Sequence, residues 1–175
     1  MDANRKHKLC LSVILAVSVL FRVIVALYLG NVVDAPPLLT DQRSYHALGA
    51  RLQEGYGFSF DRAWYPFTPE NTPTAHWSFL YSLFIAGIYA LFGVNPLAAR
   101  LIQGILGGLL LPLMVYRLSK ALFAFPNRKP SIRGIGEAEV QAVPLVGAGA
   151  AACYGYFILH AATLMTETFY IVALL

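Results

Sequence analysis

The chain has 175 residues, of which 58% are hydrophobic and only 13% are charged, and its formal net charge is +4. Soluble domains carry about twice this share of charged residues, so the composition excludes an ordinary soluble protein and indicates a membrane protein. The basic residues form short clusters between apolar blocks and are not interleaved with stacking aromatic residues, which argues against nucleic acid as a partner.

The first predicted element is a transmembrane span over residues 9–29. It is preceded by three basic residues, Arg5, Lys6 and Lys8. Basic residues that flank a span stay on the cytoplasmic side, so we expect a cytoplasmic N-terminus and an outer loop over residues 30–96. The polar part of this loop, residues 30–76, contains five acidic residues and three arginine residues, a balance that suits the outer side.

A short amphipathic helix is predicted to begin at Asp41. Its apolar face is formed by Tyr45, Leu48 and Leu52, and Gly55 ends it. A carboxylate at a helix start is favoured by the free backbone N–H groups and by the helix dipole. The residues alone therefore allow two roles for Asp41, a helix cap or a functional acid.

Four apolar blocks follow, and one of them is expected not to cross the membrane. We predict spans over residues 97–119 and 143–164 and the start of another at residue 168. The loop that joins the first two is basic and should be cytoplasmic, on the same side as the N-terminus. The block at residues 77–93 is short for a span, so we expect it to lie along or dip into the outer surface.

These elements predict an all-α fold, a polytopic transmembrane helix bundle with two interfacial helices in the first outer loop. Small residues recur at every fourth position, at Gly104 and Gly108 and again at Gly147, Ala151 and Gly155, and predict close helix packing. Because the chain stops within its last span, we expect residues 1–175 to be the N-terminal part of one multi-span domain of the cell membrane.

Four stretches in this order resemble the N-terminal part of the GT-C glycosyltransferases: "TDQRSYHALGARLQEGYGFSF", "TPTAHWSFLYSLFIAGIYALFG", "NPLAARLIQGILGG" and "LMTETFYIVALL". The likeness is to the branch of protein O-mannosyltransferases and lipid A aminoarabinose transferases. It implies an inverting enzyme that moves a sugar from polyprenyl phosphate to a lipid, glycan or protein acceptor on the extracytoplasmic side.

The resemblance also implies roles for individual residues. Asp41 matches the first-loop acid of the family, Tyr45 its usual tyrosine, and Glu167 a second acid at the outer end of a later span. Many members have Asp-Glu where this chain has Asp41-Gln42, so a metal held by such a pair has no support. We expect no cofactor, with a divalent metal left open.

The chemistry of sugar transfer requires a base for the acceptor's proton and cations for the leaving phosphate. Asp41 is the predicted base and Glu167 a second acid. The predicted phosphate partners are four arginine residues, Arg22, Arg43, Arg62 and Arg100. Arg22 has an alternative as a snorkelling or ion-paired residue of the first span. His76 either orients substrate or anchors the interface beside Trp77.

A non-enzymatic protein is the alternative for the whole chain, either a transporter fragment or a subunit that packs against a partner. A transporter is expected to place its charges in mid-membrane at broken helices. The acidic residues of this chain gather at one face, which favours the enzyme.

Overall fold

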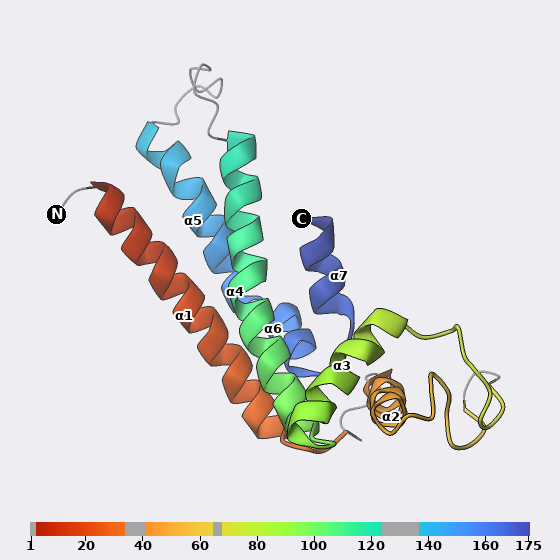
Figure 1. Cartoon of the computed structure of the whole chain (residues 1–175). Coiled ribbons are helices and arrows are strands. Elements are labelled where there is room, and N and C mark those ends of the chain that lie inside the picture. The colour runs from red at the N-terminus through yellow and green to blue at the C-terminus, as the bar shows by residue number, and fades with distance from the viewer. Residues whose placement is uncertain (1–2, 34–40, 65–67, 124–136) are drawn as a thin grey trace.

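The computed structural model describes residues 3–33, 41–64, 68–123 and 137–175 (Figure 1). Within these ranges the chain is helical and has no strand, only two isolated β-bridges in the loop before residue 77. The expected all-α class is therefore confirmed. The helices of the described ranges are α1 (Ala3–Leu29), α2 (Asp41–Gln53), α3 (Phe79–Phe92), α4 (Pro96–Phe123), α5 (Glu137–Cys153), α6 (Gly155–Ala162) and α7 (Glu167–Leu174).

Helices α1 and α4 are long and apolar enough to cross a membrane. They lie side by side and antiparallel (Figure 1). Gly108 allows this approach, because a Cβ atom there would lie 2.9 Å from the Cα of Val19. Apolar side chains on the other faces of α1 remain exposed, as Leu27 does at 57%. Such a surface is suited to lipid contact.

The segment predicted to span the membrane over residues 143–164 is divided between two helices, and its crossing stays a prediction. Helices α5 and α6 meet at a 53° bend after Cys153, and together they form a third potential crossing. In a straight helix the carbonyls of Ala151 and Ala152 would accept bonds from the following turn. Here they accept hydrogen bonds from Arg22 of α1 instead. Side-chain donors that replace backbone donors in this way are a recognised cause of helix kinks.

The block at residues 77–93 forms a helix too short to span. Helix α3 has 14 residues and is about 21 Å long at 1.5 Å per residue, against a hydrocarbon layer of about 30 Å. This length agrees with the expectation that the block does not cross, and its orientation to a membrane stays a prediction. Helix α3 buries Ser82, Ile85 and Tyr89, which are spaced three and four residues apart on one helical face.

Helix α2 packs its apolar face against α3 (Figure 1). Tyr45 and Leu48 are buried there, as the periodicity predicts, and Gly55 follows the helix with φ 85°. Gly49 makes the contact close, since a Cβ atom at that position would lie 2.4 Å from Cγ2 of Ile85. The two short helices thus form one platform beside the lower end of the long helices.

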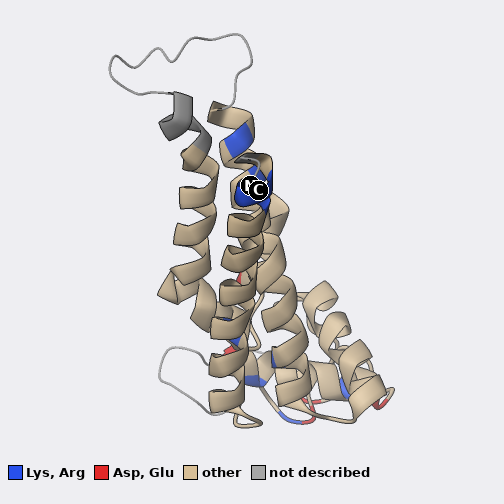
Figure 2. Ribbon diagram, turned by 90° about the vertical axis from the view of Figure 1, so that its left-hand side faces the viewer, with Lys and Arg blue, Asp and Glu red and all other residues tan. Residues whose placement is uncertain are grey.

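Charged residues lie mainly at the two ends of the long helices (Figure 2). The basic residues at the start of α1 and at the end of α4 share one end of the molecule: Arg5, Lys6, Lys8, Arg117 and Lys120. A contact between His7 Nε2 and Tyr116 Oη of 2.9 Å joins the two helices near that end. The two basic clusters can lie on the same side of a membrane, as predicted, only if they are at the same end of the molecule. Their cytoplasmic position remains a prediction.

The topology is testable by thiol labelling in intact cells. We expect a Glu70→Cys variant, in a Cys10→Ser and Cys153→Ser background, to react with a membrane-impermeant reagent. A Lys120→Cys variant should react only after the membrane is permeabilised, because α4 separates the two exposed positions. Equal labelling of both variants in intact cells would contradict the prediction.

Candidate functional site

Tyr45 of α2 follows the predicted acid Asp41 by one helical turn, and its side chain is buried. Burial is the largest influence on this phenol and raises its pKa above the ordinary value. Hydrogen bonding to the Ser78 backbone and to the Thr166 side chain lowers the pKa, and the negative charges of Asp41 and Glu167 raise it. Asp41 is exposed at the first turn of α2, and Glu167 begins α7. The charges of the two acids are the weakest of these influences, so the catalytic roles of Asp41 and Glu167 stay a prediction.

Glu167 also lies beside a buried histidine. Its Oε1 atom is 3.7 Å from Nδ1 of His160, and the Glu167 side chain is 31% exposed. The His160 ring packs against that of Tyr156, with 3.9 Å between ring centroids. Among the described residues, Oε2 of Glu167 and Nδ1 of His160 are buried without a hydrogen-bond partner. A carboxylate with an unsatisfied oxygen next to a titratable ring is suited to bind a polar group.

Arg100, a predicted phosphate partner, is fully buried at the start of α4. Its guanidinium donates hydrogen bonds to three carbonyls that end α1, those of Leu29, Gly30 and Val32. It also donates to Oε1 of Gln42, at 2.9 Å. The bonds of Arg100 thus cap the C-terminal end of α1 and fix the residue next to Asp41. A contact with phosphate stays a prediction.

Arg22 is also fully buried, within α1. Its guanidinium donates to the hydroxyl of Ser18 at 2.6 Å and to the Ser18 carbonyl at 3.0 Å. It further donates to the carbonyls of Ala152 at 3.2 Å and Ala151 at 3.4 Å. These bonds hold the broken end of α5, so they give Arg22 a structural role. Its proposed contact with phosphate is left as a prediction.

Gln103 is a site residue that the sequence analysis missed. It is fully buried in α4, and its amide nitrogen donates to the carbonyls of His160, Thr163 and Met165. Its amide oxygen accepts a hydrogen bond from the Tyr81 hydroxyl of α3. Gln103 therefore positions the turn that carries Glu167. The available signal was a polar side chain within an apolar span, which is rare and usually functional or bridging.

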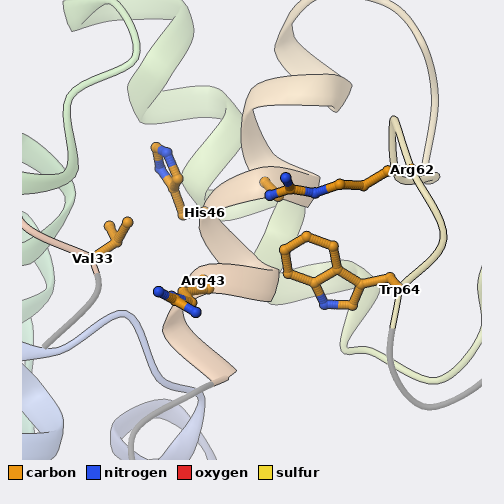
Figure 3. A pocket seen from close by; sticks show the side chains of 6 residues that line it. Val33, Arg43, His46, Arg62 and Trp64 are labelled. Atoms are coloured by element: carbon orange, nitrogen blue, oxygen red, sulfur yellow. The ribbon is translucent and has the colours of Figure 1, made fainter. Parts of the chain in front are cut away.

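Arg43 and Arg62 lie together at a hollow on α2 (Figure 3). Both side chains are exposed, and the indole of Trp64 forms another wall. Successive residues of a helix turn by about 100°, so Arg43 projects about 200° away from Asp41. The hollow consequently opens on a different face of α2 from the one that carries Asp41 and Tyr45.

His76 is exposed in the loop before α3. Its ring lies edge-on to that of Trp77, with 5.2 Å between centroids, and its backbone N–H donates to the Thr74 hydroxyl at 3.4 Å. The alternative that His76 anchors the interface depends on this contact between the rings of His76 and Trp77. A substrate contact of His76 stays a prediction.

The described residues contain no group of three or more histidine, cysteine or acidic side chains that could hold a metal ion. The expectation that no cofactor is needed stays a prediction, as does the open question of a divalent metal.

Comparison of the chain with protein-family models, with curated proteins and with solved structures finds no match in any of the three.

Proposed function

We propose that the protein is an inverting membrane glycosyltransferase of the GT-C type, which moves a sugar from polyprenyl phosphate to an extracytoplasmic acceptor. One observation carries the proposal. It is the carboxylate of Glu167, whose Oε1 atom lies 3.7 Å from Nδ1 of His160 and whose Oε2 atom is buried without a hydrogen-bond partner among the described residues. The resemblance described above supplies the reaction class, and α2, which begins at Asp41, lies at the end of the molecule opposite the start of α1 and the end of α4 (Figure 1).

In the proposed reaction the acceptor hydroxyl gives its proton to the carboxylate of Asp41. The acceptor oxygen then bonds to the anomeric carbon of the sugar, and the bond from that carbon to the phosphate oxygen breaks. The phosphate leaves with the electron pair, so no general acid is needed on that side.

Tyr45 stays protonated at neutral pH, because the ordinary pKa of a phenol is about 10 and burial raises the pKa of Tyr45 above that value. It is therefore a hydrogen-bond donor toward a carboxylate or a sugar hydroxyl. Glu167, with one oxygen buried and unpartnered among the described residues, is the proposed ligand for a polar group of the sugar or acceptor.

A transfer assay tests the proposal directly. The protein, as its gene encodes it, is reconstituted in proteoliposomes with a panel of labelled polyprenyl-phosphate sugars and lipid acceptors. We expect transfer with at least one donor and none in a matched sample carrying Asp41→Asn together with Glu167→Gln. Absence of transfer with every donor, from protein whose helix content is normal, would argue against the enzyme.

One observation favours the transporter alternative, the cation at the broken α5–α6 pair. Arg22 is fully buried there and donates to backbone carbonyls, so it is sealed from a solvent path. The same proteoliposomes separate the two functions: counterflow of a free sugar without transfer would identify a transporter.

A further inference from the structure

The two predicted acids lie on helices with different packing partners. Asp41 begins α2, which packs on α3. Glu167 begins α7, which packs on α4 and α6. The α2–α3 platform lies to one side of the long helices, and α7 lies between the platform and the C-terminal end of the chain (Figure 1). The spacing of the two helix starts therefore depends on the side chains that join the platform to the rest of the fold.

Tyr81 of α3 makes such a connection. Its side chain is buried, at 4% exposure. Its ring lies edge-on to that of Tyr45 on α2, with 4.9 Å between centroids, and its centroid is 6.2 Å from that of Phe169 on α7. Its hydroxyl donates to the amide oxygen of Gln103 on α4. Tyr81 thus contacts three other helices.

The direction of the bond between Tyr81 and Gln103 follows from the other bonds of the amide. The Gln103 nitrogen is within hydrogen-bond distance of three carbonyl oxygens, those of His160, Thr163 and Met165. Carbonyls only accept hydrogen bonds, so the amide must turn its nitrogen toward them and its oxygen toward α3. Burial raises the pKa of Tyr81 well above its ordinary value, so the hydroxyl keeps the proton that it donates.

The same three carbonyls determine where α7 begins. They belong to the end of α6 and to the turn over residues 163–166, and Glu167 follows this turn directly. Gln103 is fully buried, so its bonds to the turn are protected from competition by water. Two side chains, those of Tyr81 and Gln103, consequently connect the platform to the turn that carries Glu167.

We propose that Tyr81 is a positioning residue, which acts through Gln103 to set the position of Glu167 relative to the α2–α3 platform and its first residue, Asp41. The effect of this spacing on catalysis rests on the proposed function, whereas the spacing itself does not. A purely structural role would be that Tyr81 and Gln103 satisfy each other as buried polar groups without fixing α7.

Tyr81→Phe separates these two roles, because it removes one oxygen atom and keeps the ring. The full chain carries two spin labels, at Leu91→Cys on α3 and Tyr170→Cys on α7, in a Cys10→Ser and Cys153→Ser background. Both labelled positions are exposed, at 78% and 64%. The distribution of distances between the labels is measured in proteoliposomes by pulsed electron paramagnetic resonance.

We expect a narrow distance distribution in the parent and a shifted or broader one in Tyr81→Phe. Gln103→Met removes the other partner with a side chain of similar size and should have the same effect. Tyr116→Phe is the matched control. It removes the hydroxyl that contacts His7 near the other end of α4, and it should leave the distribution unchanged.

Transfer kinetics give a second readout. Tyr81→Phe should lower kcat/KM by about tenfold or more, because misplacing a catalytic group by about 1 Å costs up to about 100-fold. In a Glu167→Gln background the same substitution should have little further effect, since the group that it misplaces is already lost. Tyr116→Phe should leave kcat/KM unchanged in both backgrounds.

An unchanged distance distribution in Tyr81→Phe overturns the inference. An equal loss of kcat/KM in the parent and in the Glu167→Gln background also overturns it, because Tyr81 would then act independently of Glu167. If the parent transfers no sugar, the proposed function fails, and the distance measurement still decides whether Tyr81 positions α7. If circular dichroism shows that Gln103→Met has lost helix, Tyr81→Phe alone decides.

Discussion

The Asp41→Asn variant is expected to insert and fold normally and yet to transfer sugar roughly 10²–10⁴-fold more slowly, which is the usual effect of losing a general base. Asparagine caps a helix about as well as aspartate does, and the Asp41 side chain is exposed, so its replacement removes no buried contact. The measurement is initial transfer rate in proteoliposomes, together with helix content by circular dichroism.

Glu54→Gln is the matched control for this prediction. Glu54 is an exposed acid just beyond the other end of α2, and its substitution makes the same change of charge. We expect its transfer rate to equal that of the parent. An unchanged rate in Asp41→Asn would reduce Asp41 to a helix cap and remove the base from the proposed mechanism.

Arg100→Met is expected to destabilise the fold by about 3 kcal/mol or more, whether or not the protein binds a donor. The carbonyls of Gly30 and Val32 and the Gln42 side chain lose this donor, while the Leu29 carbonyl keeps a hydrogen bond from the Val32 backbone N–H. A buried polar group left without a partner costs about 1–3 kcal/mol. The free energy of unfolding is measured by titrating purified protein with sodium dodecyl sulfate and following its helix content.

Arg43→Met removes the same charge from an exposed position and serves as the control. Surface substitutions usually change stability by no more than about 0.5 kcal/mol. If Arg100→Met were as stable as Arg43→Met and only bound a polyprenyl-phosphate donor more weakly, Arg100 would be a phosphate ligand, as the sequence suggested, and not mainly a cap of α1.

Local patterns in the sequence were enough to predict the short helices. The apolar face of α2 follows from residue spacing within a few turns, and the structure buries Tyr45 and Leu48 accordingly. The break between α5 and α6 was not predictable in this way. At the break the Ala152 carbonyl accepts a hydrogen bond from Arg22, which is 130 positions away in the chain, and no proline lies at the break.

The candidate site also contains residues that the sequence indicated and residues whose roles only the fold reveals. Asp41, Tyr45 and Glu167 were predicted from the resemblance of the surrounding residues to the GT-C glycosyltransferases. The roles of Arg100 and Gln103 required the fold, because their partners are backbone carbonyls, which every residue carries and which leave no mark on the sequence. The sequence alone does not distinguish a buried arginine or glutamine that binds a ligand from one that binds the end of a helix.

The bond between Arg22 and the broken helix has a consequence for biogenesis. A ribosome adds about 5–20 residues per second, so the carbonyls of Ala151 and Ala152 are made roughly 6–26 seconds after Arg22. A first span that enters the bilayer as it is made carries a cation whose distant partners do not yet exist, at a cost of up to about 2.5–3.5 kcal/mol. Ser18, one turn earlier, offers its hydroxyl and carbonyl at once. The nascent α1 thus contains a first partner for Arg22, Ser18, and the bonds from Arg22 to α5 are added last.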